Sequence, residues 1–370
     1  MTGMEIGVHR VPMDSPADTS GLETMIAAGA VDPRTIIACI GKTEGNGGAN
    51  DFTRALATLS YQRMLAKYIG VEQSEKIAFV WSGGTEGVLS PHATVFTRTD
   101  RAVADSPDGH EGLVLSVQTT REIPPEHVGR SFMVEEVATA TRKAMEDAGV
   151  RSKEDVHYVQ VKGPLLTPAG IREASGTGKT VVTRDPNLSK GFARGAMALG
   201  VALALGEIDG DGLNLDAVIN HDLSLFSRVA STSAGGELRS CEVILMANTP
   251  RGIGPLTIGH SQLKDAIDTD GVREAIGNAG MELEGAVTED LQKRIVAVFA
   301  KAEASPAIRG FRTTMYSDAD IHYERHARAA VGAIIASVIG GGAIFVSGGT
   351  EHQCAPGSAP IAAIVKRQLS

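Results

Sequence analysis

A five-residue motif that occurs twice, with a third and looser copy between, constrains the fold more than any other feature of this chain. Residues 82–86 read Ser-Gly-Gly-Thr-Glu, and residues 347–351 repeat them without change. The middle copy, 233–237, reads Ser-Ala-Gly-Gly-Glu and keeps the serine and the glutamate at the same spacing. Each outer copy follows a short apolar run typical of a strand, which presents a serine hydroxyl beside backbone N–H groups. Three spaced copies predict internal repeats.

The order of the predicted elements divides the chain into three units, residues 1–104, 110–250 and 255–370. Each unit begins with a strand and a helix and continues with a strand that ends at a lysine. A second helix, the serine turn and a last strand then follow. Segments with proline and glycine, 100–109 and 249–255, separate the units as linkers. The sequence therefore predicts an α/β fold of three homologous repeats.

Three kinds of polar residue recur at equivalent places in these units. A lysine ends the second strand, an arginine lies early in the second helix, and a serine heads the turn. The lysines are Lys42, Lys162 and Lys301, the arginines are Arg54, Arg194 and Arg328, and the serines are Ser82, Ser233 and Ser347. One such residue alone is more often a solvent-exposed residue without a specific role than part of an active or binding site. The same trio in three equivalent places predicts a site.

A serine and a lysine together can hydrolyse an amide without a metal or a histidine. Serine becomes a nucleophile when a base removes its proton, and a neutral lysine can be that base. A free lysine, with a pKa of about 10.4, is charged at neutral pH, but burial and neighbouring cations lower the pKa. The arginines would orient a carbonyl, and N–H groups after the serine would stabilise an oxyanion. Three units around a pseudo-threefold axis would suit a small planar ring with three equivalent polar edges.

Composition argues against several other classes of protein. A net charge of −9 disfavours a nucleic-acid partner. The cysteines, Cys39, Cys241 and Cys354, are odd in number and far apart, and indicate neither a disulfide framework nor a zinc site. No signal peptide and no run as long as a membrane span is apparent, so we expect a cytoplasmic protein without a membrane partner. Residues 176–180 imitate a phosphate-binding loop, but Glu173 stands where its first glycine belongs.

Longer motifs around the recurring residues resemble the cyanuric acid hydrolase and barbiturase family of cyclic amide hydrolases. These motifs are residues 41–47, 81–92, 159–162, 299–305 and 347–353. The resemblance covers essentially the whole chain. It implies three repeats around a pseudo-threefold axis, with a central β-barrel, helices outside, and assembly as a homotetramer. It also implies ring opening of cyanuric acid to carboxybiuret, which loses CO₂ to give biuret, without an organic cofactor.

The resemblance further implies that the middle unit carries the chemistry, with Ser233 as nucleophile and Lys162 as its base. The other pairs and the arginines are then expected to hold the remaining edges of a small cyclic imide. The implied substrate contacts are Lys42, Arg54, Ser82, Gly83, Arg194, Ser233, Ala234, Lys301, Arg328, Ser347 and Gly348. The middle turn is the copy that departs from Ser-Gly-Gly-Thr-Glu, as expected where the symmetry is broken.

A structural divalent cation in the third unit is another property that the family resemblance implies. The implied ligands are Glu303 and oxygens of the loop that follows Ser347, contributed by Thr350, Gln353, Cys354, Ala355 and Ser358. Oxygen ligands suit a hard cation such as Mg²⁺ or Ca²⁺. Ser358 stands where the family usually has a glycine. A surface salt bridge made by Glu303 is the alternative interpretation.

Two alternative functions stay open on the sequence. Barbituric acid has a CH₂ group where cyanuric acid has a third N–H, so a barbiturase, which forms ureidomalonate, needs different contacts at one edge. Within the family, cyanurate enzymes keep all three helix arginines, whereas barbiturases vary at the second and third. The presence of Arg194 and Arg328 therefore favours cyanuric acid. The second alternative is a binding protein of the same topology that uses the arginines without catalytic pairs.

Overall fold

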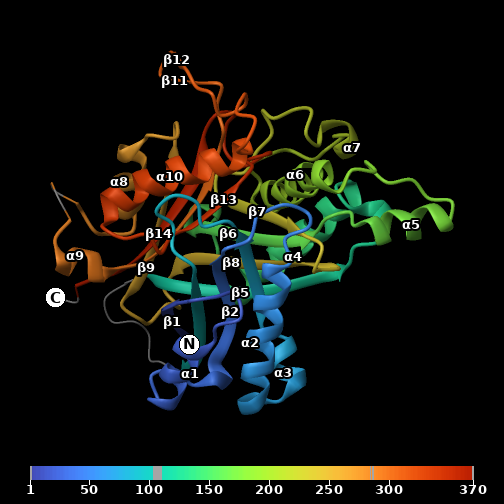
Figure 1. Ribbon diagram of the computed structural model, residues 1–370. Coiled ribbons are helices and arrows are strands. Elements are labelled where there is room, and N and C mark those ends of the chain that lie inside the picture. Colours follow the sequence, from blue (N-terminus) through green and yellow to red (C-terminus); the bar gives the residue numbers. More distant parts are fainter. Residues whose placement is uncertain (1, 103–110, 284, 286, 369–370) are drawn as a thin grey trace.

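The computed structural model describes residues 2–102, 111–283, 285 and 287–368, and its long strands form three four-stranded sheets (Figure 1). The first sheet contains β1 (Thr2–Pro12), β2 (Ile36–Thr43), β3 (Ala78–Gly83) and β4 (His92–Ala102). The second contains β5 (Gly112–Glu122), β6 (Val156–Pro164), β7 (Ala230–Gly235) and β8 (Ser240–Thr249). The third contains β9 (Leu256–Leu263), β10 (Ile295–Ala302), β13 (Phe345–Gly348) and β14 (Ala359–Lys366).

All three sheets have the same strand order and the same strand directions. The orders are β1-β4-β2-β3, β5-β8-β6-β7 and β9-β14-β10-β13. In each sheet the first three strands are antiparallel neighbours, and the fourth runs parallel to the third. The mixed α/β class is confirmed. The expected closed barrel is wrong for the described residues, because hydrogen bonds join the strands within three separate sheets.

Helices pack against the outer faces of the sheets (Figure 1). The longer helices are α2 (Thr53–Ile69), α4 (Ser131–Ala148), α6 (Pro186–Leu205), α8 (Thr269–Asn278) and α10 (Tyr323–Ile339). The shorter ones are α1 (Ser20–Ala27), α3 (Val71–Glu75), α5 (Pro168–Gly176), α7 (Leu215–Val218) and α9 (Glu289–Arg294). Helices α4 and α6 end at Gly149 and Gly206, which is the C-terminal stop that their sequences predict.

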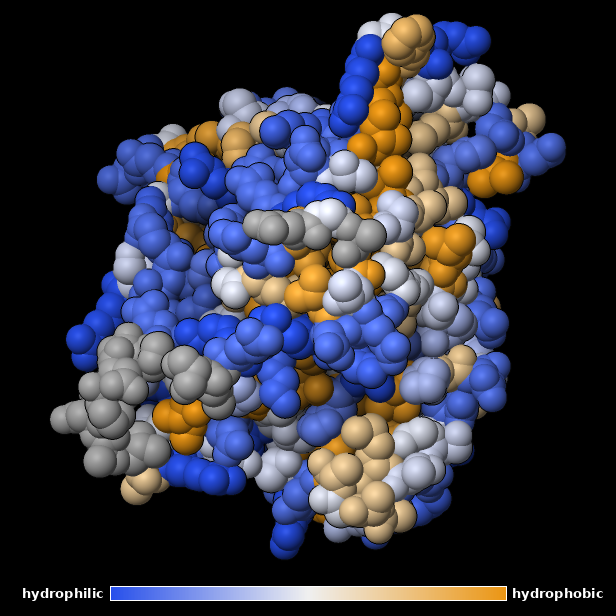
Figure 2. Space-filling model, turned by 90° about the vertical axis from the view of Figure 1, so that its left-hand side faces the viewer, coloured by the Kyte–Doolittle hydropathy of each residue, from blue (hydrophilic) through white to orange (hydrophobic). Residues whose placement is uncertain are grey.

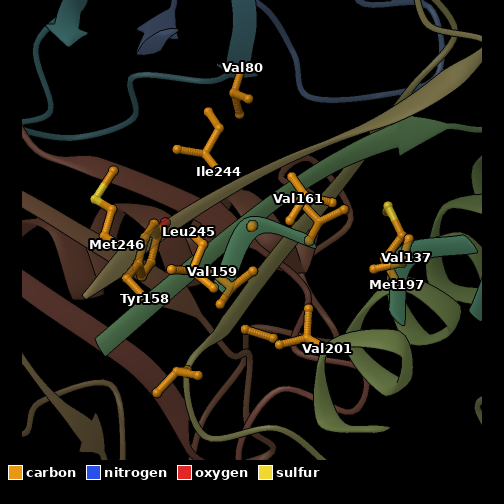
Figure 3. Close-up of a cluster of buried hydrophobic side chains, with 14 of the residues drawn as sticks. Val80, Val137, Tyr158, Val159, Val161, Met197, Val201, Ile244, Leu245 and Met246 are labelled. Carbon is orange, nitrogen blue, oxygen red and sulfur yellow. The ribbon is translucent and has the colours of Figure 1, made fainter. Parts of the chain in front are cut away.

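The largest buried apolar cluster draws side chains from all three sheets. Phe299 of the third sheet has its ring 6.2 Å from Phe96 of the first and 5.2 Å from Tyr158 of the second, between centroids. Figure 3 shows part of this cluster, including Val80 of the first sheet and Ile244 of the second. The sheets therefore meet through side-chain packing, and burial of this apolar surface stabilises their arrangement.

Two further apolar clusters lie between a sheet and its own helices. In the first sheet, Trp81 packs edge-on against Tyr61 of α2, with ring centroids 5.3 Å apart. In the third, Val298 belongs to the same cluster as Val331 and Ile335 of α10. The helices that carry Arg54 and Arg328 are thus fixed on their sheets by apolar contacts.

Helix α6 is long and apolar enough to cross a membrane, which corrects the expectation that no run of that length exists. In the fold, 72% of its most apolar window is buried in protein. Its small residues allow this packing, since a Cβ on Gly200 would lie 2.7 Å from the backbone oxygen of Val134 in α4. The composition of α6 is that of a helix covered by protein on most sides.

A short hairpin of β11 (Ala307–Ile308) and β12 (Phe311–Arg312) projects at the top of Figure 1. Phe311 at its tip is 81% exposed. The face seen in Figure 2 is mixed: hydrophilic residues dominate its left-hand side, and more apolar residues lie on the right and below the projection at the top.

Some predicted boundaries differ from the structure. The three serines lie inside the last residues of strands β3, β7 and β13, because each of these strands continues its parallel pairing past the serine. In the first predicted linker, residues 100–102 extend β4 by pairing with β1, and residues 103–109 lie outside the described part. The segment that imitates a phosphate loop begins at the last residue of α5 and continues into the turn beyond it.

Candidate active site

In each sheet a lysine and a serine occupy paired positions on the two parallel strands. Register partners on neighbouring strands project to the same face, so each lysine and its serine share one face of the sheet. All six side chains are buried. The pairs are Lys42 with Ser82, Lys162 with Ser233, and Lys301 with Ser347. The lysine and serine positions that recur in the sequence are therefore neighbours in the fold.

Each lysine also reaches into a neighbouring sheet. Lys42 Nζ donates to the backbone oxygen of Val346, the residue before Ser347, at 2.6 Å. Lys162 Nζ donates to the oxygen of Trp81, the residue before Ser82, at 3.0 Å. Lys301 Nζ completes the cycle by donating to the oxygen of Thr232, the residue before Ser233, at 2.7 Å. The three pairs are thus connected in a ring, which places them around one centre.

The three helix arginines form a second ring of contacts that runs in the opposite direction. Each arginine pairs with the glutamate four residues after the serine of another sheet. The shortest N–O distances are 3.7 Å for Arg54 with Glu237, 2.6 Å for Arg194 with Glu351, and 2.5 Å for Arg328 with Glu86. Every serine turn is therefore held by an arginine from one neighbouring unit and a lysine from the other.

The arginine–glutamate contacts explain why the second residue after the serine in each outer turn is a glycine. Gly84 and Gly349 have φ values of +102° and +79°, which side chains disfavour. A Cβ on Gly349 would lie 2.3 Å from Cζ of Arg194, and one on Gly84 would lie 2.7 Å from an Arg328 nitrogen. The guanidinium groups occupy the space that side chains would fill.

In the middle turn, the arginine also binds the backbone, since Arg54 Nη1 donates to the Ala234 oxygen at 3.4 Å.

Burial changes the charge of the three lysines. Burial, reinforced by the Arg328 cation, lowers the pKa of Lys42 well below its ordinary value. Burial and the Arg194 cation do the same to the pKa of Lys301. Lys162 is affected less: burial lowers its pKa to about 8, while Glu237, 3.3 Å from Nζ, opposes the change. At neutral pH these lysines can supply the neutral amine that a general base requires.

The middle pair differs from the two outer pairs in its hydrogen bonds. Lys42 Nζ donates to Ser82 Oγ at 3.1 Å and lies 3.5 Å from the Gly83 oxygen. In the third sheet, the Lys301 amine donates in the same way to the Ser347 hydroxyl and the Gly348 oxygen, at 3.0 and 2.9 Å. Ser233 Oγ is buried and has no hydrogen-bond partner among the described residues. The middle hydroxyl therefore has no hydrogen bond to Lys162 or to another described residue, whereas each outer hydroxyl accepts one from its lysine.

Three of the six predicted cation ligands line a cavity of about 190 Å³ next to the third pair: Glu303, Thr350 and Cys354. The other three, Gln353, Ala355 and Ser358, are not among its lining residues. Glu303 lines it, is largely buried, and accepts a hydrogen bond from the Thr350 hydroxyl. Burial raises the pKa of Glu303, and within the described residues no cation pairs with it within 4 Å. The described residues hold no group of three His, Cys, Asp or Glu side chains suited to a metal. A cation here would therefore need backbone oxygens of the loop in addition to this carboxylate, and such hard oxygens fit Mg²⁺ or Ca²⁺.

The same loop is bound to the strand that carries Ser233. Gln353 Oε1 accepts from the backbone N–H of Thr232 at 2.7 Å, and Cys354 N–H donates to the Ser227 oxygen at 2.8 Å. Ser358 closes the loop by donating to the Ala355 oxygen at 2.6 Å. Contacts that hold this loop in the third unit therefore also help to hold the strand that carries Ser233.

Sequence reasoning missed the partners of the arginines. Glu86, Glu237 and Glu351 belong to the repeated motif, but the sequence interpretation gave them no role. The sequence does contain a pattern that could have identified them, because the glutamate recurs at a constant distance from the serine and a buried arginine needs an anion. Lys190 and Glu324 were also missed; they lie four residues before Arg194 and Arg328 and face each other at 3.5 Å.

Known proteins share this arrangement of sequence and fold. The model of the family described as "Amidohydrolase ring-opening protein" matches residues 7–366. The chain therefore belongs to this family of ring-opening amidohydrolases, and the resemblance drawn from the motifs is confirmed. It is an enzyme of the amidohydrolase class.

Individual relatives match along nearly their whole length. A protein of Azorhizobium caulinodans named cyclic amide hydrolase is 60% identical over 98% of this chain and 100% of its own. Barbiturase 1 of a Nocardioides species is 44% identical over 97% of this chain and 98% of its own. A solved structure of a cyanuric acid hydrolase has a TM-score of 0.92 and 46% identity, covering 99% of this chain and 100% of that one. Because the last two values of identity are close, overall identity does not separate the two substrates.

Proposed function

We propose that this enzyme opens the ring of cyanuric acid by hydrolysis, with Ser233 as the nucleophile and Lys162 as its base. The product is carboxybiuret, which loses CO₂ to give biuret. The likeness to a cyanuric acid hydrolase structure supports this substrate. So does the presence of all three helix arginines in one ring of buried contacts.

The proposed chemistry proceeds in two steps. Neutral Lys162 accepts the proton of Ser233, and Oγ attacks a ring carbonyl carbon. The C–N bond then breaks, and the ring nitrogen takes the proton back from the lysine ammonium. In the second step, water attacks the carbamoyl-serine ester, Lys162 accepts a proton from it, and Ser233 leaves with that proton. The surrounding cations stabilise negative charge on the carbonyl oxygen.

The observation that carries this proposal is the difference between the middle pair and the outer pairs. Ser233 Oγ has no partner among the described residues, whereas Ser82 and Ser347 accept hydrogen bonds from their lysines. A nucleophile must be free to approach the carbonyl. The outer serines, with their lysines and the arginines, then act as donors that position the other two carbonyl edges of the ring.

A ring of three equivalent edges fits an enzyme of three homologous repeats. We propose that the units 1–104, 110–250 and 255–370 are repeats around a pseudo-threefold axis that passes through the ring of lysines. The common strand order and the two cyclic sets of contacts support this arrangement.

A structural Mg²⁺ or Ca²⁺ is proposed beside the third pair. Glu303 and backbone oxygens between Thr350 and Ser358 would hold it. Support comes from the largely buried Glu303 carboxylate, which lines the cavity and has no cationic partner within 4 Å among the described residues. Such an ion would fix the loop that reaches Thr232. The homotetramer implied by the family stays a prediction, which sedimentation of the purified enzyme would test.

Single substitutions test the proposed roles. We expect Ser233→Ala and Lys162→Ala each to lower kcat by about a thousandfold or more, with an unchanged melting temperature. Ser82→Ala is the matched control, and we expect it to raise KM while leaving measurable turnover. Biuret and CO₂ release measure the rate. Wild-type turnover in Ser233→Ala together with an inactive Ser82→Ala would reverse the assignment.

Substrate choice is tested separately with the wild-type enzyme. We expect kcat/KM for cyanuric acid to exceed that for barbituric acid by at least tenfold, because all three arginines are present to hold the three edges. A higher value for barbituric acid would show that the enzyme is a barbiturase. Binding without turnover of either ring would support the alternative of a binding protein.

A further inference from the structure

Glu242 lies directly across the sheet from Lys162. The two residues are register partners on the antiparallel strands β8 and β6. Side chains at such positions share a face of the sheet, with Cβ atoms about 5 Å apart. The corresponding partner of Lys42 in the first sheet is His92. In the third sheet, the pairing of β10 with β14 ends at Ala300, one residue before Lys301. A carboxyl group opposite the lysine is thus found in the middle sheet and at neither of the other two.

The Glu242 carboxyl is poorly solvated and has few partners. Its Oε2 atom is buried and has no hydrogen-bond partner among the described residues. Burial raises the pKa of Glu242 to about 8, although the Lys162 cation and the backbone N–H of Phe79 both oppose the change. Glu242 and Lys162 therefore titrate in the same pH range, and their protonation states are coupled.

Other charged groups face this pair from the neighbouring elements. Glu237, after β7, acts on both Lys162 and Glu242. Arg54 of α2 and Asp51, just before α2, act on Lys162 with opposite signs. Glu237 is shared with Arg54, at 3.7 Å. Glu242 has no salt bridge within 4 Å in the described part of the chain, so its charge is not already committed to another cation.

We propose that Glu242 is a positioning residue that controls the charge of Lys162 during the reaction. This inference rests on the proposed function, in which Lys162 accepts the proton of Ser233. Where Glu242 is ionised, from about pH 8 upward, its carboxylate stabilises the ammonium that forms at that moment and makes Lys162 a stronger base than burial alone would allow. Glu242 does not contact the substrate and transfers no proton itself. Its presence in one sheet of three gives the middle lysine a different basicity from the outer two.

Removal of the negative charge tests this role through the pH profile. Without the carboxylate, the charged form of Lys162 is less favoured, so its pKa falls. In Glu242→Gln we therefore expect the rising limb of kcat against pH to move toward acid by about one pH unit. We also expect the high-pH plateau to fall severalfold, because a weaker base accepts the serine proton less readily. Glu242→Asp keeps a carboxylate, so the midpoint of its limb should lie close to that of the wild type.

A matched control is available at Glu207, a second largely buried carboxyl whose pKa burial raises and whose Oε2 also has no partner among the described residues. Glu207 lines a separate cavity with Arg228 and His260. Glu207→Gln should leave the midpoint of the limb in place. Glu242→Met provides a second uncharged variant if the glutamine variant fails to fold.

The pH profiles of the Glu242 variants test this inference, whereas the activity of Lys162→Ala tests the proposed function. The inference is supported if the limb moves toward acid in Glu242→Gln, stays in place in Glu207→Gln, and lies near the wild-type position in Glu242→Asp. A lower kcat at every pH with an unmoved midpoint overturns it, because a merely structural role would have that effect. Full activity in Lys162→Ala would remove the proposed function itself, and the inference with it, whatever the profile of the Glu242 variants.

Discussion

The pH dependence of the wild-type enzyme is the most direct measure of the site's electrostatics. Burial lowers the pKa of Lys162 to about 8. The neutral fraction of such a base is about 9% at pH 7, about 50% at pH 8 and about 91% at pH 9. We therefore expect kcat/KM to rise about tenfold between pH 7 and pH 9 and then to level off. An unperturbed lysine would give a rise of about a hundredfold over the same interval, and no plateau below about pH 10.

The assay is release of biuret and CO₂ at substrate concentrations well below KM, because kcat/KM then reports the groups of the free enzyme, to which this pKa belongs. Lys162→Arg is the control, since its guanidinium keeps its proton across this range and should support no turnover at any of these pH values. The rate should rise with pH because Lys162 can act as a base only after its ammonium has lost a proton. A rate that falls between pH 7 and 9, or one that still climbs steeply at pH 10, would refute the assignment of a buried lysine base.

Four further substitutions test the surroundings of the site. Arg328→Met breaks the buried pair with Glu86, and we expect a loss of about 3–5 kcal/mol in denaturant unfolding. Arg325→Met removes a 47% exposed partner of the same glutamate, so its cost should stay below about 1 kcal/mol. Glu303→Ala should lower the melting temperature, as a chelator should for the wild type, with rescue of the wild type alone by Mg²⁺ or Ca²⁺. Ile244→Ala should cost about 2–5 kcal/mol by emptying part of the central cluster, as chemical denaturation would measure.

The connection between the loop and Thr232 changes what Glu303→Ala should do to catalysis. From the sequence, Glu303 lies next to the third pair alone, and its removal would spare the middle pair. In the structure, Gln353 accepts a hydrogen bond from the residue before Ser233. We therefore expect the rate to fall together with the melting temperature. An unchanged kcat would show that the loop keeps its position without the ion.

Local pattern in the sequence was sufficient for the long helices, for most of the long strands and for the trio of site residues, whereas the short helices α3, α5, α7 and α9 were not predicted. Apolar runs before the two outer copies of the motif predict strands that end near a serine, and the structure has them at β3 and β13. It also has β7 before the middle copy, where no apolar run predicted a strand. The recurrence of lysine, arginine and serine at equivalent positions identified every lysine and arginine of the two rings. Such patterns are readable because a strand or a helix imposes a fixed spacing on the residues along one face.

Tertiary structure alone decided which residues meet across the units. Arg194 and Glu351 are 157 positions apart, and the motif gives no indication of which arginine binds which glutamate. Partner choice depends on how the three sheets pack around their common core, and therefore on the shapes of many apolar side chains at once. For the same reason the sequence did not reveal that Glu242 stands opposite Lys162, since antiparallel register is fixed by the pairing of whole strands. The sequence thus determined which groups are present, and the packing determined the charge and the hydrogen bonds of each.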